Sequence, residues 1–394
     1  MLPAGYRPQD LHEQRFQVEF DYPVAFVNGV LSLDQPALAW AVTRREPGRR
    51  RPVYAVFDGG LVKAQPDLPA KLAAYVREHE ALLDLRGAYV VAGGEAVKND
   101  PDIANRLLGE FARARLDRHA VVACFGGGAV LDAVGYAASV AHRGLRMLRL
   151  PSTVLAQCDG GVGVKTSLNG FAAKNFVGTF APPHAVIDDF DLLATLPLRD
   201  ARAGMAEAVK VALIRDPSLF EFMEANADAL ARAEAAPLAT LVRRCAGLHL
   251  AHIAGGGDPF EVGSARPLDY GHWSAHKLEI LSNYELLHGE AVSIGMLLDA
   301  RYAEQRGLLS TADLERLGAL LDRLGLPTYH PALVARDGDE LAVLRGLQDF
   351  REHLGGALTV TLLHGIGRGS EVNEMDTPTV ERAIAWLGER AGRR

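Results

Sequence analysis

The sequence predicts a two-domain protein in which an α/β domain is followed by an all-helical domain. Three observations support this. At 394 residues the chain is longer than most single domains. Its first half alternates strand-like and helix-like segments, which is typical of βαβ units around a largely parallel sheet. From about residue 198 onward, long helical patterns dominate.

The expected elements of the first half follow the order of βαβ units. Strands are predicted at 53–57, 88–92, 120–125 and 147–150, and helices at 68–84, at 101–116 and from the glycines at 126–128 to about 141. Glycine pairs or triplets follow the first three strands, at 59–60, 93–94 and 126–128. Glycine ends an apolar run and lets the chain turn, so each strand end is well marked.

The second half is expected to be helical almost throughout. Helices are predicted at 199–213, 234–253, 285–306, 311–324 and 376–390, with one late strand at 358–363. The turn at Pro197 is a reasonable helix start, so the domains are expected at 1–197 and 198–394, with a cleft between them.

Composition excludes several classes of partner. The net charge of −7 provides no global positive field for nucleic acid or an anionic membrane, so a phosphorylated ligand would need a local basic pocket. The three cysteines, Cys124, Cys158 and Cys245, are odd in number and widely spaced, which favours small buried residues over disulfides or a cysteine zinc site. No signal peptide and no stretch of 18 apolar residues is visible, so a cytoplasmic protein is expected.

A triple-glycine loop suggests a nucleotide site. Gly126, Gly127 and Gly128 lie between a strand and a helix, where backbone N–H groups can approach a pyrophosphate. The loop is not GxGxxG, and a tight strand-to-helix turn is the alternative interpretation. Asp58, at another strand end, is placed to hold ribose hydroxyls, although such residues often serve only as helix caps.

Three residues of the second half form a candidate metal site. Glu207, His272 and His288 are donors suited to Zn²⁺ or a related divalent ion. A lone histidine on a helix is more often structural, but here glycine stands beside each one, which permits close packing. Glu207 falls in an apolar helical stretch, where burying an unpaired carboxylate is costly unless a cation is bound.

The segment 159–175 suggests a phosphate pocket. Lys165, Asn169, Lys174 and Asn175 crowd hydrogen-bond donors into a glycine-rich loop, which suits a phosphate monoester or several sugar hydroxyls. A solvated surface loop is the alternative. Positive charge from elsewhere would come from Arg143 and from Lys210, one helical turn beyond Glu207.

Together these motifs resemble the sugar phosphate cyclase superfamily, whose best-known member is dehydroquinate synthase. The resemblance covers roughly residues 50–300. Its most specific marks are Phe125-Gly126-Gly127-Gly128 with Asp132, Asp159 through Lys165 to Lys174-Asn175, Ala206 to Lys210, and Gly271-His272 followed by His288-Gly289-Glu290. The resemblance implies a Rossmann-like nucleotide-binding domain, a helical metal- and substrate-binding domain, and a carbon–oxygen lyase that uses NAD and one divalent ion, Zn or Co.

The resemblance also implies a role for each site residue. The ion would be bound by Glu207, His272 and His288. NAD would contact Asp58, Glu95, Lys98, Gly127, Gly128 and Asp132, and Asp132 would also line the catalytic site. The catalytic site would be lined by Asp159, Lys165, Lys174, Asn175, Lys210 and His276. Arg143 matches a family arginine that reaches the phosphate site of the neighbouring subunit, which implies a homodimer.

Some positions depart from dehydroquinate synthases. Seven residues before His272, where that enzyme has a carboxylate-binding arginine, stands Ala265, followed by Arg266. A family lysine aligns near Ala251 and His252. Two dipeptides also differ: Leu-Asn becomes Leu268-Asp269 before Tyr270, and His-Pro becomes Gly170-Phe171. This pattern resembles the branch that makes C7 cyclitols, including 2-epi-valiolone-type synthases, while His276 separates it from 2-epi-5-epi-valiolone synthases, which tend to have proline there.

The expected function is therefore cyclisation of a ketose phosphate, with sedoheptulose 7-phosphate as the favoured substrate. The expected chemistry is transient oxidation by NAD, phosphate elimination, re-reduction and intramolecular aldol closure. Three alternatives stay open: dehydroquinate synthase proper, a metal-dependent polyol or alcohol dehydrogenase of the same fold, and a catalytically silent sugar-phosphate-binding protein.

Overall fold

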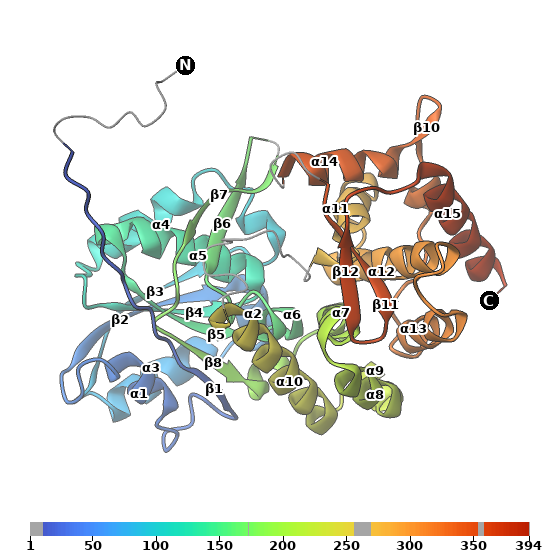
Figure 1. The fold of residues 1–394 in the computed structure, drawn as a ribbon. Helices are drawn as coiled ribbons and strands as arrows, with labels where there is room; N and C mark the ends of the chain where they lie inside the picture. Colours follow the sequence, from blue (N-terminus) through green and yellow to red (C-terminus); the bar gives the residue numbers. More distant parts are fainter. Residues whose placement is uncertain (1–10, 172, 256–268, 354–357, 394) are drawn as a thin grey trace.

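The computed structural model describes residues 11–171, 173–255, 269–353 and 358–393. A half centred on a sheet and a mainly helical half lie side by side (Figure 1). Among the described residues, no helix combines the length and apolar character needed to cross a bilayer.

Within the described residues, the first half contains a six-stranded parallel sheet in the order β1-β8-β5-β4-β2-β3. The strands are β1 (Val24–Val27), β2 (Arg51–Asp58), β3 (Leu83–Val91), β4 (Val121–Gly126), β5 (Arg146–Pro151) and β8 (Ala185–Asp189). From β2 the chain moves outward to β3, then returns to β4 on the other side and continues to β5 and β8. The carboxyl ends of β2 and β4 therefore flank a topological switch point, where open parallel sheets bind ligands.

Helices cover both faces of the sheet. They are α1 (Ala37–Thr43), α2 (Gly59–Ala64), α3 (Leu68–Glu78), α4 (Ile103–Arg113), α5 (Gly128–Val140) and α6 (Val154–Cys158). Along β2, Val53 and Phe57 pack into the core that contains α1 and α3, while Tyr54 and Val56 pack into the core that contains α4 and α5. Burial on both faces explains why the central strands β2 and β4 are apolar at nearly every position between their ends. The four strands predicted here are confirmed.

An antiparallel hairpin projects from the sheet half towards the helical half (Figure 1). It consists of β6 (Lys165–Gly170) and β7 (Ala173–Phe180). The prediction of a glycine-rich loop across 159–175 is therefore wrong beyond residue 164. The polar residues in both strands hide the apolar alternation that would have indicated a hairpin.

The second half is built from helices around one hydrophobic core. They are α7 (Leu198–Arg215), α8 (Pro217–Ala225), α9 (Ala227–Ala231), α10 (Ala235–Ala254), α11 (His272–Leu281), α12 (His288–Gln305), α13 (Thr311–Arg323), α14 (Arg345–His353) and α15 (Thr377–Gly392). Helix α12 is buried on nearly all sides from Gly289 to Ala300, as expected for the central helix of a bundle.

Two small hairpins refine the expectation of an all-helical second half. They pair β9 (Arg336–Asp337) with β10 (Glu340–Leu341) and β11 (Val360–Gly365) with β12 (Arg368–Val372). The late strand predicted at 358–363 corresponds to β11. Helix α7 begins at Leu198 with Pro197 as its N-cap residue. The domain boundary after residue 197 stays a prediction, because α10 also packs on the sheet half through Ala246, against Val162 and Val186.

Candidate active site

Glycines bring three helix backbones of the second half into direct contact. A Cβ atom at Gly289 would overlap the carbonyl oxygen of Ala203, so the start of α12 lies against the middle of α7. A Cβ atom at Gly271, whose φ is +78°, would lie 2.7 Å from the backbone nitrogen of Met296. Helices α11 and α12 both begin with a histidine, so these contacts place His288 beside α7 and His272 beside α12. The close packing predicted from the flanking glycines is confirmed.

Three imidazole rings gather where these helices meet. The ring centroid of His272 lies 5.4 Å from that of His276 and 5.4 Å from that of His288. The Nδ1 atom of His272 lies 3.0 Å from the carbonyl oxygen of Tyr270, and Nδ1 of His288 lies 3.2 Å from Oε2 of Glu279. An imidazole that donates from Nδ1 presents the lone pair of Nε2, which is the arrangement of metal-ligating histidines.

The third predicted metal ligand is the carboxylate of Glu207, on α7. Its side chain is buried, and Nζ of Lys210 lies 2.7 Å from its Oε1 atom. Burial raises the pKa of Glu207 to about 7, even though Lys210 opposes this shift. Burial and the nearby Lys210 lower the pKa of His272 well below its ordinary value, so this ring is neutral and able to bind a metal. A bound cation would keep the Glu207 carboxylate ionised.

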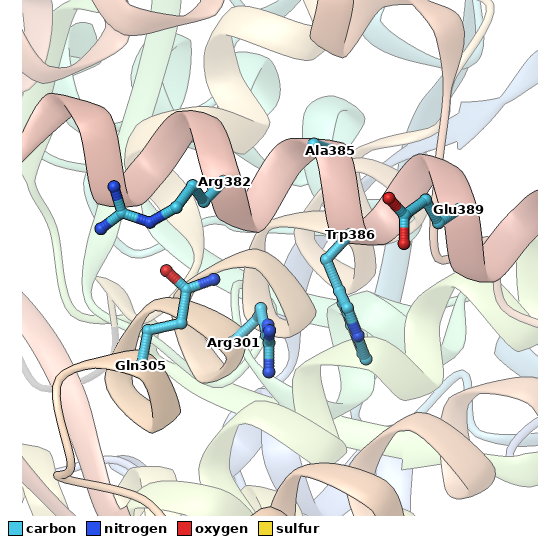
Figure 2. A pocket seen from close by; sticks show the side chains of 6 residues that line it. All are labelled: Arg301, Gln305, Arg382, Ala385, Trp386 and Glu389. Atoms are coloured by element: carbon cyan, nitrogen blue, oxygen red, sulfur yellow. The ribbon is translucent and has the colours of Figure 1, made fainter.

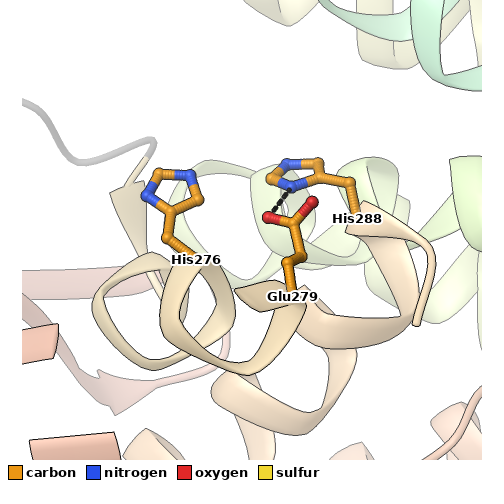
Figure 3. A group of neighbouring side chains, drawn as sticks. All are labelled: His276, Glu279 and His288. Carbon is orange, nitrogen blue, oxygen red and sulfur yellow. Dashed lines mark hydrogen bonds and ion pairs between the residues drawn. The ribbon is translucent and has the colours of Figure 1, made fainter. Parts of the chain in front are cut away.

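The compact group of donors that the described residues form shares only His288 with the predicted ligand set. Ligand atoms of His276, Glu279 and His288 all lie within 4.8 Å of one another (Figure 3). Glu279 is buried and already accepts from Lys174, whose Nζ lies 2.8 Å from Oε1. Burial alone would raise the pKa of Glu279, but His288 and Lys174 outweigh it and lower the pKa to about 2.

This geometry favours Glu279 as a partner that orients His288 rather than as a ligand. A carboxylate bonded to Nδ1 of a metal-ligating histidine is a recurrent arrangement in metal sites. The ligand set of Glu207, His272 and His288 therefore stays our prediction, with Glu279 added behind it. Sequence reasoning missed Glu279, although it stands seven residues after His272 and hence on the same helix face.

The expected dinucleotide loop lies at the switch point of the sheet. Gly127 is the N-cap residue of α5, and a Cβ atom at Gly128 would have nothing within 4 Å, so the space in front of the helix start is open. Asp58 accepts from the backbone N–H of Gly60 at 2.7 Å and therefore caps α2, as its alternative interpretation suggested. Backbone donors at an open helix N-terminus fit a pyrophosphate.

Lys98 ties the predicted cofactor loop to the hairpin. Its buried ammonium group donates to Oδ2 of Asp132 at 2.7 Å, to Oγ of Ser167 at 3.0 Å, and to Oδ1 of Asn175. These three bonds use all the donors of an ammonium group. The structure thus brings Lys98, Asp132 and Asn175 together and adds Ser167, which sequence reasoning missed. Direct contact between Lys98 and NAD stays a prediction.

The other predicted substrate and cofactor residues do not form one cluster within the chain. Glu95 accepts from the side-chain amide of Asn169 at 2.8 Å, so the loop after β3 is fastened to β6. Lys165 is exposed at the start of β6, whereas Lys174 reaches α11 through Glu279. Arg143 is exposed beyond the far end of α5, about 20 Å from Gly128 along the helix, and does not join the other residues within one chain.

Asp159 lies between the two halves of the site and has an unpredicted neighbour. Nδ1 of His249, on α10, lies 3.2 Å from Oδ1 of Asp159. Burial would raise the pKa of Asp159, but His249 and Lys210 outweigh it and hold the pKa below its ordinary value. Asp159 is therefore an anion facing two basic groups. His249 lies on α10 among apolar residues, three positions before His252, and this pattern gave no signal for a site residue.

Several departures from the dehydroquinate synthase pattern lie at the edge of this region. Ala265, Arg266 and Leu268 fall outside the described residues. Nδ1 of His252 lies 3.0 Å from Nη2 of Arg215 at the end of α7. Phe171 is 85% exposed at the turn of the hairpin.

A separate cavity of about 510 Å³ lies between α12 and α15 (Figure 2). It is lined by Arg301, Gln305, Arg382, Ala385, Trp386 and Glu389. Arg301 stands thirteen residues after His288 on α12, which is about 20 Å along the helix axis. This cavity is therefore not part of the candidate active site.

Two family models match consecutive parts of the chain. The model described as 3-dehydroquinate synthase N-terminal matches residues 88–203, and the model described as 3-dehydroquinate synthase C-terminal matches residues 204–343. Together they cover the triple-glycine loop, the hairpin and the predicted metal ligands.

Curated proteins and solved structures resemble the chain over most of its length. The 3-dehydroquinate synthase of Xylella fastidiosa strain M12 is 33% identical over 92% of this chain and 95% of its own length. The 2-epi-valiolone synthase of Actinosynnema mirum is 39% identical over 77% of this chain and 78% of its own length. The structure of 2-epi-5-epi-valiolone synthase from Streptomyces hygroscopicus subsp. jinggangensis 5008, with NAD⁺ and Zn²⁺ bound, has a TM-score of 0.86 at 31% identity and covers 96% of this chain and 100% of that one.

Proposed function

The chain belongs to the 3-dehydroquinate synthase family of sugar phosphate cyclases, and from this premise we propose that it is an NAD- and metal-dependent lyase that converts a ketose phosphate into a carbocycle. The observation that carries the proposal is the gathering of the His272, His276 and His288 rings where α11 and α12 meet, with the buried Glu207 and Lys210 on the adjacent helix α7.

The described residues fit both groups that this chemistry needs. Glu207, with Nε2 of His272 and of His288, would hold one divalent ion, and the open N-terminus of α5 at Gly127 and Gly128 would receive the pyrophosphate of NAD. When bound, the ion polarises substrate oxygens and NAD accepts and returns a hydride. The solved 2-epi-5-epi-valiolone synthase, which contains NAD⁺ and Zn²⁺, supports this assignment.

The protein's own side chains would orient the hydroxyl groups of the substrate and bind its negatively charged phosphate. Lys210 and Asp159 would hold adjacent hydroxyl groups, because one is a donor and the other an acceptor, and they lie close enough for Lys210 to lower the pKa of Asp159. Lys165 and Asn175 would bind the leaving phosphate from the hairpin, with Arg143 supplied by a second subunit. Lys98 would keep Asn175 and Asp132 in place through the bonds described above.

Sedoheptulose 7-phosphate is the substrate we propose. Dehydroquinate synthases hold a substrate carboxylate with an arginine seven residues before the first metal histidine, and this chain has Ala265 there. A ketose phosphate without a carboxylate does not need that arginine for binding, so the replacement by alanine would not weaken its binding. The similarity to the 2-epi-valiolone synthase of Actinosynnema mirum supports the same choice.

Dehydroquinate synthase activity is the second candidate, favoured by relatives of that name such as the Halorhodospira halophila protein, which is 40% identical over 275 residues. The two candidates differ in substrate and share the release of phosphate. The purified protein, supplied with NAD⁺ and Co²⁺, is incubated separately with sedoheptulose 7-phosphate, 3-deoxy-arabino-heptulosonate 7-phosphate and glucose 6-phosphate. We expect phosphate release from the first without net NADH; release from the heptulosonate alone would establish the second candidate.

Oxidation of a simple alcohol with net formation of NADH would instead indicate a dehydrogenase. The phosphate-binding residues of the hairpin have no use in such a reaction, which is why we do not favour it. In every arm of the experiment, absorbance at the NADH maximum is followed beside phosphate, so that the two classes of reaction are separated directly.

A further inference from the structure

We propose that Arg149 is a positioning residue that holds the segment between Asp159 and Lys165 in its catalytic conformation. Arg149 lies on β5, and its side chain is almost fully buried, with 1% of the residue exposed. The inference rests on the function proposed above, because Asp159 and Lys165 are there assigned to the substrate.

The contacts of Arg149 are unusual for a buried cation. Nη1 donates to the carbonyl oxygens of Gly160, Gly161 and Gly163 at 3.3, 3.2 and 2.7 Å, and Nη2 donates to that of Lys165 at 3.2 Å. Within the described part of the chain, its guanidinium forms no ion pair with a carboxylate. Burying a charged guanidinium costs free energy unless its N–H groups are hydrogen-bonded, so the folded protein is most stable when these carbonyl oxygens stay in place around Arg149.

These bonds all fall on one short segment. The segment leaves α6 at Asp159 and enters β6 at Lys165, and three of its five intervening residues are glycine. Glycine-rich backbone has many accessible conformations, so a fixed path needs an external template. Arg149 is such a template, because a planar guanidinium presents several donors in a rigid geometry.

Fixing the segment also fixes the side chains at its two ends. Asp159 is held on one side by His249 and faces Lys210, while Lys165 opens the hairpin that carries Asn175. Orientation of reacting groups is sensitive to displacements of about 1 Å, which can cost about a hundredfold in rate. Loss of Arg149 therefore lowers turnover without removing any group that touches the substrate.

The test compares Arg149→Lys with a matched control, Arg51→Lys. Arg51 is also buried on a strand, but at the amino end of β2, where it pairs with Glu46 at 2.8 Å. We expect Arg149→Lys to lower kcat by about 10- to 100-fold while Zn²⁺ content and NAD⁺ affinity stay within about twofold of wild type. Arg51→Lys should lower the unfolding temperature and leave kcat unchanged.

A double-mutant cycle separates positioning from a general structural role. Arg149→Lys is combined with Asp159→Asn and, separately, with Lys165→Met, and all variants are assayed at saturating substrate. If Arg149 acts by positioning Asp159 and Lys165, each double variant loses less activity than the product of its two single losses. Multiplicative effects in both pairs, or unchanged kcat in Arg149→Lys, would overturn the inference. An inactive wild-type protein would instead refute the proposed function, so the two failures are distinguishable.

Discussion

At the residue scale, the site is defined by partners that stand far apart in the sequence. Glu279 bonds to Lys174, which lies 105 positions away, and to Nδ1 of His288. It contacts a predicted metal ligand without needing to bind the ion. Its effect on the metal should therefore be indirect.

Glu279→Gln tests that effect. The amide keeps the shape of the side chain but removes the negative charge that favours donation from Nδ1 of His288. We expect Zn²⁺ affinity to fall by about 10- to 100-fold, measured by competition with a chromophoric chelator. Glu285→Gln, on the loop before α12, is the control and should bind Zn²⁺ normally. Complete loss of stoichiometric Zn²⁺ in Glu279→Gln would indicate that Glu279 is itself a ligand.

Asp188 gives a prediction about stability rather than function. Its carboxylate on β8 is fully buried, and among the described residues neither oxygen has a hydrogen-bond partner. Burial raises the pKa of Asp188 well above its ordinary value. The folded state therefore holds a proton that the unfolded state releases above about pH 4, so stability falls as pH rises from there towards the folded-state pKa.

Asp188→Asn should remove this pH dependence. We expect the unfolding temperature of the wild type to fall more than that of the variant as pH rises above about 4, measured by differential scanning calorimetry. Asp34→Asn, at an exposed position, is the control and should follow the wild type. Parallel curves for wild type and Asp188→Asn would show that Asp188 does not titrate as we describe.

At the element scale, the site depends on how closely α7, α11 and α12 approach. The contact of Gly289 with Ala203 leaves no room for a methyl group. By contrast, a Cβ atom at Gly247 on α10 would meet nothing within 4 Å. The same substitution should therefore have opposite effects at the two positions.

Gly289→Ala should destabilise the protein by about 3 kcal/mol and lower its Zn²⁺ content, because α12 has to move away from α7. Gly247→Ala should stabilise it by about 1 kcal/mol, because alanine favours the helix. Chemical unfolding and metal analysis on both variants check these values. Equal stability of the two variants would contradict the close packing at Gly289.

Much of this arrangement follows from local sequence patterns. The buried strands and long helices have clear apolar periodicity, and the glycines beside His272 and His288 indicate close packing from the sequence alone. The hairpin at 165–180 was missed because its polar side chains interrupt that periodicity. Arg149, Glu279 and His249 were missed because their roles depend on contacts between distant segments, which one sequence does not reveal.

At the scale of the whole molecule, metal binding is coupled to protonation and to folding. In the metal-free protein, burial raises the pKa of Glu207 to about 7, so below that pH a proton occupies the carboxylate. A cation then has to displace the proton before it binds. The lowered pKa of His272 keeps this ring from competing in the same range.

We therefore expect Zn²⁺ affinity to fall by up to about tenfold per pH unit below about pH 7 and to level off above it. Removal of the ion with a chelator should lower the unfolding temperature, because the ion binds the folded state. Titration calorimetry at several pH values measures the first effect. A Glu207→Gln variant should bind Zn²⁺ weakly and without this dependence; an unchanged slope would exclude Glu207 as the titrating ligand.

The ion pair between Lys174 and Glu279 joins the β6–β7 hairpin of the sheet half to helix α11 of the other half (Figure 1). A hinge movement that carried the hairpin away from α11 would break this pair. Glu279 would lose Lys174 and keep its contact with His288. Glu279 would then serve His288 alone, so the open molecule should hold its ion at least as tightly as the closed one. Opening of the molecule would thus let the product leave without promoting loss of the metal.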